Sequence, residues 1–262
     1  MLYNSVDKKQ KLLSWLIRSV NMRLFKRKEK KFRSGIVIAE KGKKIGSGGY
    51  TRLRDNIIYL NATGNKKVIQ IESAVPHEGK TTLVANLAVS LGYTDKKVLI
   101  IDLDLRRPRL HRMFKLAKET GLADFILSTA SKEEILKETE YPNVKIITRG
   151  AEVTNPSLIL LSDKFKNLMA ELREEFDYII IDCAPMLQVS DYIHVSKISD
   201  GILFLAAFGK TTKAQVSEAI NELRKNNIEV LGSVFTMYDK KKDKSYGYYG
   251  RYYSYEYEDH EN

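Results

Sequence analysis

The chain has 262 residues, 43% of them hydrophobic and 29% charged, which is enough for one sizeable globular domain or two small ones. No apolar run reaches the roughly 18 residues that a membrane-spanning helix needs, and the first residues lack the pattern of a secretory signal. A single cysteine, Cys183, excludes a disulfide framework and a cysteine-based metal site within one chain, as expected for a reducing cytosol.

The net charge of +11 is concentrated at the start of the chain. Residues 1–52 hold 15 Lys and Arg against three acids, whereas the rest is close to neutral. We therefore expect residues 1–49 to form a basic arm that ends in a Gly-rich joint. Residues 11–25 in this arm have apolar side chains at helical spacing. Such a helix would lie on an anionic membrane surface, or pack on a partner or on its own domain, and the pattern leaves both open.

Residues 50–238 alternate between predicted strands and predicted helices. We expect helices at 50–60, 80–91, 162–175 and 213–225, and strands at 67–73, 97–102, 145–148, 178–182, 201–206 and 230–236. Apolar strands that alternate with helices build right-handed βαβ units. The sequence therefore predicts an α/β domain with a mainly parallel sheet and helices on both faces.

The end of the chain, residues 239–262, differs from this domain. It contains a cluster of tyrosines: Tyr246, Tyr248, Tyr249, Tyr252, Tyr253, Tyr255 and Tyr257. No aliphatic residue lies among them to anchor a core, so we expect a flexible tail. Generic surface stickiness would use all the aromatic residues, so a run of tyrosine alone favours a use of the phenol group.

A candidate phosphate-binding loop lies between the first predicted strand and the helix after it. It comprises Ala74, Val75, Pro76, His77, Glu78, Gly79, Lys80, Thr81 and Thr82. A small residue, four others and then Gly-Lys-Thr match the P-loop spacing, although Ala74 stands where Gly is usual. In a P-loop, backbone amides cradle the phosphates, Lys80 reaches the β- and γ-phosphates, and Thr81 binds Mg²⁺. A Gly-Lys-Thr that merely starts a helix is the plainer alternative.

Carboxylates at the ends of two predicted strands argue against a Gly-Lys-Thr that merely starts a helix. Asp102 ends one apolar strand and Asp182 another, and Asp104 follows Asp102 by two residues. Because the carboxyl ends of parallel strands form the ligand edge of such a sheet, these groups would meet the P-loop. Either aspartate alone could be a helix or turn cap. Together with the P-loop they predict a site for ATP and Mg²⁺.

These stretches resemble a known family, the bacterial tyrosine kinases, in particular the stand-alone cytoplasmic type of capsule and exopolysaccharide loci. The resemblance runs from about residue 53 to 257 and rests on the P-loop, on residues 101–114 (IDLDLRRPRLHRMF) and on residues 178–185 (YIIIDCAP). Shorter matches are Gly121-Leu122, Asn155-Pro156 and Ser190-Asp191. The tyrosine-rich tail has the position and composition of the family's autophosphorylation cluster.

The resemblance implies a fold related to the partition and cell-division-site ATPases, and a role for each site residue. Lys80 and Thr81 would bind the phosphates and Mg²⁺, and Asp182 would complete the metal shell. Asp102 and Asp104 would hold metal-bound water and orient or deprotonate the tyrosine hydroxyl. The tail of one subunit would enter its neighbour's active site.

The family resemblance also implies partners. A membrane-spanning polysaccharide co-polymerase would activate the kinase and recruit it from the cytoplasm to the inner face of the membrane. Further substrates would be protein tyrosines. The basic arm, rather than the resemblance, indicates a contact to anionic lipid, and we expect none to nucleic acid. The expected function is autophosphorylation of the tail, which regulates capsular or exopolysaccharide polymerisation or export.

Some positions depart from the family pattern. A Glu-x-x-Arg-x-x-Arg motif that joins the subunits of a ring falls here on Gly48, Thr51 and Arg54, so only Arg54 remains. Thr236 stands where an Asn near the purine is common, and Leu158 replaces the acid after Asn-Pro. A ring is therefore open to question.

Two other functions compete with the tyrosine kinase. A partition-type ATPase switch would use the basic arm on DNA or lipid, but that class has a second lysine near the start of its P-loop, and residues 74–76 contain none. A non-catalytic scaffold would dock a partner through the arm and the tail, although intact Lys80, Asp102, Asp104 and Asp182 argue against it.

Overall fold

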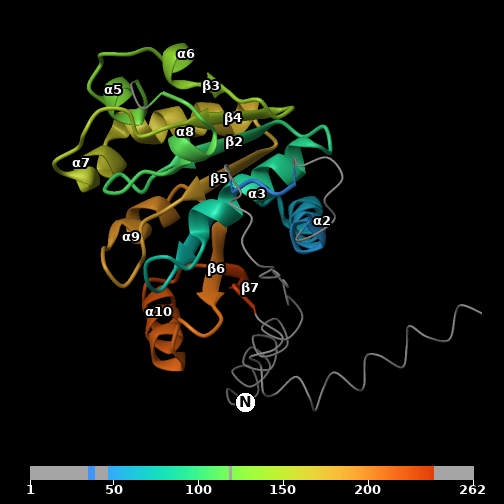
Figure 1. Cartoon of the computed structure of the whole chain (residues 1–262). Coiled ribbons are helices and arrows are strands. Elements are labelled where there is room, and N and C mark those ends of the chain that lie inside the picture. The colour runs from blue at the N-terminus through green and yellow to red at the C-terminus, as the bar shows by residue number, and fades with distance from the viewer. Residues whose placement is uncertain (1–34, 39–46, 118–119, 239–262) are drawn as a thin grey trace, which may run out of the picture.

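The computed structural model describes residues 35–38, 47–117 and 120–238 (Figure 1). The predicted amphipathic helix at 11–25 and the tyrosine cluster at 246–257 lie outside these residues. Both remain predictions.

A seven-stranded sheet forms the centre of the molecule (Figure 1), with the strand order β3-β4-β2-β5-β1-β6-β7. The strands are β1 (Val68–Ser73), β2 (Val98–Asp102), β3 (Lys137–Glu138), β4 (Val144–Ile147), β5 (Tyr178–Asp182), β6 (Gly201–Ala207) and β7 (Val230–Thr236). All neighbours pair in parallel except the two-residue edge strand β3, which is antiparallel to β4. This arrangement confirms the predicted mainly parallel α/β fold.

The central strands are mostly apolar because both faces of the sheet are covered, although β1 also contains the buried Gln70 and Glu72. Successive side chains point to opposite faces, so Ile100 packs with one cluster and Leu99 with another. One face carries α2 (Ser47–Gly64) and α3 (Lys80–Gly92), which pack against each other. The other carries α7 (Pro156–Leu161), α8 (Asp163–Glu175), α9 (Asp191–Ser196) and α10 (Lys213–Lys225). Two cores, one on each face, therefore hold the strand ends in place.

Most long elements begin and end close to their predicted limits because their signals are strong. Helix α2 is the exception: it begins three residues before and ends four residues after the predicted helix at 50–60, so the end of the predicted Gly-rich joint is helical. Ser162 and Thr212 cap α8 and α10 by accepting hydrogen bonds from the amides of Phe165 and Gln215. The short elements were not predicted from the sequence: α4 (Leu110–Met113), α5 (Leu122–Ile126), α6 (Lys132–Ile135), α7, α9 and β3. Each has six residues or fewer, which is too few for a hydrophobic period to emerge.

Among the described residues, no helix combines the length and the apolar character that a membrane crossing requires.

Candidate active site

The predicted P-loop connects β1 to α3 at the carboxyl edge of the sheet. Gly79 has φ of 95°, in the left-handed region that favours glycine, and α3 begins at the next residue. Lys80 is 7% exposed, and its Nζ donates a hydrogen bond of 2.9 Å to the Ser73 hydroxyl. The amides at the start of α3 and the Lys80 ammonium thus present positive charge to one point, as phosphate binding requires.

Glu78 holds this loop in shape from the inside. Its side chain is buried, and its carboxylate accepts hydrogen bonds from the amide of Val75 at 2.7 Å, from the amide of Ala207 at 3.2 Å and from the Thr211 hydroxyl. The Thr236 hydroxyl donates to the Glu78 carbonyl at 2.6 Å. The sequence placed Glu78 in the loop but not in this internal clamp, because its partners Ala207, Thr211 and Thr236 are more than 120 residues away.

Two aspartates meet across neighbouring strands beside the P-loop. Asp102 ends β2 and Asp182 ends β5, and the two are direct partners in the parallel register. Both are buried, whereas Asp104 is partly exposed. Asp102 Oδ2 accepts from the amides of Arg109 and Leu110, each at 3.2 Å. The adjacency of β2 and β5 therefore brings the predicted carboxylates together.

The buried carboxylates are poorly neutralised. Asp102 Oδ1 and both carboxylate oxygens of Asp182 are buried without a well-formed hydrogen bond. Burial raises the pKa of Asp182 to about 7, although the Lys80 ammonium and the Thr81 hydroxyl oppose the rise. Burial, and then the charge of Asp182, raise the pKa of Asp102 well above its usual range. Two such acids favour a cation between them and the P-loop.

The available ligands fit Mg²⁺. Among the described residues, no three His, Cys, Asp or Glu side chains group closely enough to hold a metal ion by themselves. Mg²⁺ in phosphoryl-transfer sites needs only one or two carboxylates, because phosphate oxygens and water complete its shell. Thr81, Asp102 and Asp182, with unused oxygens in the two carboxylates, match that requirement.

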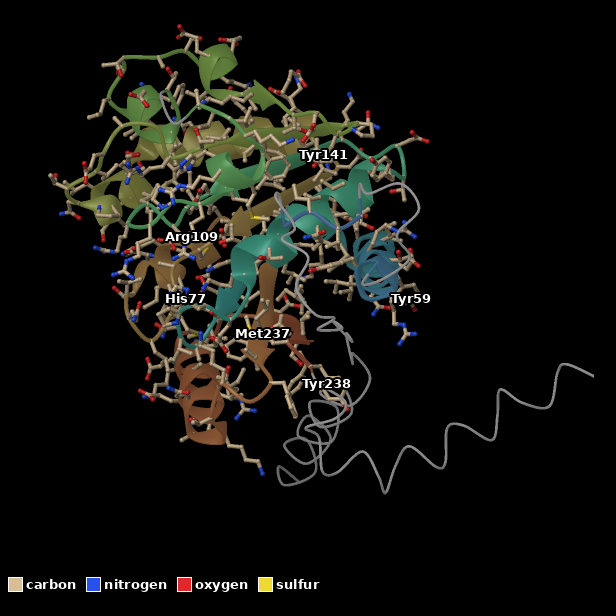
Figure 2. All side chains as sticks on the ribbon, in the orientation of Figure 1. Tyr59, His77, Arg109, Tyr141, Met237 and Tyr238 are labelled. Atoms are coloured by element: carbon tan, nitrogen blue, oxygen red, sulfur yellow. The ribbon has the colours of Figure 1, made fainter. Side chains whose placement is uncertain are left out.

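A cleft of about 800 Å³ opens at the P-loop. Thr81 lines it, whereas the buried Asp102 and Asp182 are not among its lining residues. Its lining includes residues 76–82 of the P-loop, Asp104, residues 184–185 and Met237. Figure 2 shows His77, Arg109 and Met237 on the same side of the molecule. Ala74 and Val75 do not line the cleft; they pack with a core cluster that includes residues of β6 and α10. Their contribution to the site is therefore to support the loop.

Four arginines at the mouth of the cleft were not among the predicted site residues. We call Arg106, Arg107, Arg109 and Arg112 the arginine rim; all four are exposed and line the cleft. Their clustering directly after Asp104, within seven residues of sequence, was the available signal.

The first arginine of the rim is tied to two short helices. Arg106 lies 3.5 Å from the Asp191 carboxylate, which also accepts a hydrogen bond of 3.3 Å from the Ser157 hydroxyl. Asp191 begins α9, and Ser157 lies in the first turn of α7. Two short matches to the kinase family, Asn155-Pro156 and Ser190-Asp191, thus come together behind the arginine rim.

A P-loop between β1 and α3, with carboxylates at the ends of two adjacent parallel strands, defines a P-loop NTPase. Residues 66–231 match the family model for an AAA domain. The solved structure of the septum site-determining protein MinD from Pyrococcus horikoshii, complexed with Mg-ADP, is similar with a TM-score of 0.55 and 25% identity. The match covers 64% of this chain and 69% of MinD.

Within that class, the similarity to tyrosine kinases is more extensive. The tyrosine-protein kinase YwqD of Bacillus subtilis is 32% identical over 229 residues, which cover 87% of this chain and 97% of YwqD. The crystal structure of the chimerical protein CapA2B2 has a TM-score of 0.75 and 28% identity, covering 80% of this chain and 92% of that one.

The chain belongs to the bacterial tyrosine kinase family and is a protein-tyrosine kinase of the capsule and exopolysaccharide type. Family membership thus selects the tyrosine kinase from the three functions that the sequence left open.

Proposed function

We propose that this kinase binds ATP with Mg²⁺ at the P-loop and phosphorylates its own C-terminal tyrosines. In this proposal, the phosphorylation state of Tyr246 to Tyr257 regulates polymerisation or export of a surface polysaccharide. The observation that carries the proposal is the pair of buried, poorly neutralised carboxylates, Asp102 and Asp182, beside the Lys80 ammonium.

The P-loop residues would bind the triphosphate. Lys80 lies at the start of α3, where the helix dipole and free amides already favour negative charge. Its ammonium would leave Ser73 to contact the β- and γ-phosphates. Bound Mg²⁺, held by Thr81, Asp182 and Asp102, would neutralise charge that develops on the transferred phosphoryl group.

The acceptor is a tyrosine hydroxyl, which has a pKa near 10 and needs help to become a nucleophile. Asp104 lines the cleft, and its Oδ1 accepts a hydrogen bond of 3.0 Å from the Arg107 amide. We infer that Asp104, assisted by Asp102, orients the phenol and takes its proton. The phenol oxygen then bonds to the γ-phosphorus, the bond from that phosphorus to the bridging oxygen breaks, and ADP leaves.

The proposal includes partners and a location. We infer that a membrane-spanning co-polymerase activates the kinase and recruits it to the inner face of the cell membrane. The name of the similar chimerical protein, CapA2B2, joins two components, which supports the search for a partner protein here. Arg54, which remains from the family's ring motif, forms an ion pair with its neighbour Asp55 at 2.7 Å. Transfer between copies would therefore use other contacts than those of that motif.

Phosphosite mapping of wild type against Lys80→Met tests the proposal. Both chains are incubated with ATP·Mg²⁺ and the cytoplasmic segment of the activating partner, and phosphotyrosine is mapped by mass spectrometry. We expect phosphate on tyrosines between 246 and 257 in wild type, and a loss of more than about 100-fold in Lys80→Met. An unphosphorylated wild-type tail would refute the proposal.

A further inference from the structure

The arginine rim carries more positive charge than its own surroundings neutralise. Arg106 is paired with Asp191 at 3.5 Å. Within the part of the chain that the structure describes, Arg107, Arg109 and Arg112 have no ion pair with a carboxylate. Three exposed guanidinium groups thus face the entrance that an acceptor must pass on its way to Asp104.

These arginines do not belong to the loop that cradles the triphosphate. They follow β2 and line the cleft together with Asp104, and Arg112 lies in α4. The backbone amides of Arg107 and Arg109 donate to Asp104 and Asp102, and their guanidinium groups lie exposed at the cleft. Guanidinium groups bind carboxylates well, because the planar fork matches two oxygens.

The tail has a matching charge gradient in its sequence. Residues 239–251, which contain Tyr246, Tyr248 and Tyr249, hold five Lys and Arg against two acids. Residues 252–262 hold no Lys or Arg and four acids, Glu256, Glu258, Asp259 and Glu261. Tyr255 and Tyr257 are the tyrosines with acids directly beside them. One half of the cluster is therefore attracted to an arginine rim, and the other is repelled by it.

We propose that the arginine rim selects acid-flanked tyrosines, so that Tyr255 and Tyr257 are phosphorylated before Tyr246, Tyr248 and Tyr249. This inference rests on the proposed autophosphorylation and adds an order to it. Exposed charge pairs contribute weakly one by one but act together on encounter, so we expect a preference of about three- to tenfold at low salt. The same chemistry would make other tyrosines next to Glu or Asp the preferred protein substrates.

The tail itself allows a direct measurement. Trypsin cuts after Lys244 and Arg251, which separates peptide 245–251 from peptide 252–262. Full-length wild type, first treated with phosphatase, is given ATP·Mg²⁺ and the activating segment, and phosphate on each tyrosine is followed at early times. We expect phosphate on Tyr255 and Tyr257 to rise about three- to tenfold faster than on peptide 245–251.

Two sets of variants test the cause. Arg107→Glu with Arg112→Glu reverses charge on the rim, and Glu256→Gln, Glu258→Gln and Asp259→Asn neutralise the tail. We expect each set to reduce the preference to about twofold or less, and higher salt to do the same. The KM for ATP should stay within about twofold of wild type. Arg224→Glu, an exposed arginine on α10 away from the cleft, is the matched control and should keep the wild-type order.

Each result bears on one of the two proposals. Equal rates for the two peptides, or an order that survives both variant sets, would overturn the selection by charge while leaving autophosphorylation intact. A rim variant that raises the KM for ATP without changing the order would assign the arginines to the nucleotide instead, and would also overturn it. No phosphate anywhere in the wild-type tail would refute the proposed function itself.

Discussion

Two buried glutamates lie close to each other in sequence: Glu72 precedes the P-loop and Glu78 is part of it. Glu78 is satisfied, because the amides of Val75 and Ala207 donate to its carboxylate. Glu72 in β1 is only partly satisfied: Oε1 accepts from the Gln70 side-chain amide at 2.8 Å, and Oε2 is buried without a well-formed hydrogen bond. The first carboxylate organises the loop through these hydrogen bonds, whereas burial raises the pKa of the second.

Removing the Glu78 clamp should loosen the phosphate site. In Glu78→Ala, the amides of Val75 and Ala207 lose their acceptor and the loop loses its internal brace. We expect the Kd for ATP·Mg²⁺ to rise about tenfold, equivalent to roughly 1.4 kcal/mol, as measured by titration calorimetry. Glu152→Ala, at an exposed position, is the control. Unchanged affinity in Glu78→Ala would show that the loop keeps its shape without the clamp.

Glu72 should make the protein less stable as pH rises. Burial raises the pKa of Glu72 from 4.5 to about 8. Between pH 4.5 and about 8, the unfolded state releases a proton that the folded state keeps. The free energy of unfolding therefore falls as pH rises through this range. In Glu72→Gln, the free energy of unfolding at pH 7.5 should increase by roughly 2 kcal/mol.

Urea denaturation at pH 5.5, 6.5 and 7.5 measures this effect. In Glu72→Gln, the free energy of unfolding should fall less steeply with pH than in wild type. Some pH dependence should remain, because burial also raises the pKa of Asp182. If the free energy of unfolding had the same pH dependence in wild type and in Glu72→Gln, Glu72 would be ionised in the folded protein.

At the level of elements, the sequence pattern predicted the long apolar strands but not the short helices. β2 and β5 are continuous apolar runs that end in Asp, so both the strands and their buried ends could be predicted. α4, α5 and α9 could not, since four to six residues contain no full hydrophobic period. They are held by tertiary contacts; the amide of Leu122, for example, donates to the carbonyl of Thr148.

Close packing at the end of α3 gives a prediction at this scale. A Cβ on Gly92 would lie 2.4 Å from the Pro142 carbonyl oxygen and 2.6 Å from a methyl carbon of Val144. Gly92→Ala should therefore destabilise the domain by about 2–4 kcal/mol. Gly48→Ala on α2 meets nothing within 4 Å and should be neutral or stabilising by up to about 0.5 kcal/mol. Thermal unfolding of both variants compares them, and an unaltered Tm for Gly92→Ala would contradict the packing.

At the scale of the whole molecule, the sheet order creates the site. β5 lies between β1 and β2, so Asp102 and Asp182 become neighbours although 80 residues separate them. The sequence predicted that these aspartates and the P-loop share one edge, because that follows from any parallel sheet. It did not predict the Glu78 clamp or the Arg106–Asp191 contact, because each depends on residues brought together only by the folded loops.

Transfer between copies of the chain belongs to the same scale. Met237 lines the cleft and directly precedes Tyr238, the last residue that the structure describes. A donor chain with all seven tail tyrosines changed to Phe keeps Lys80 but has no acceptor. A Lys80→Met chain keeps the acceptors but lacks the phosphate-binding lysine. Neither chain incubated alone should therefore gain phosphotyrosine in its tail.

Mixing these two chains with ATP·Mg²⁺ and the activating segment tests the central claim most directly. We expect phosphotyrosine between residues 246 and 257 of the Lys80→Met chain, read by mass spectrometry, at a rate that increases with donor concentration. Absence of phosphate from that tail, under conditions in which wild type phosphorylates itself, would contradict transfer from one copy to another.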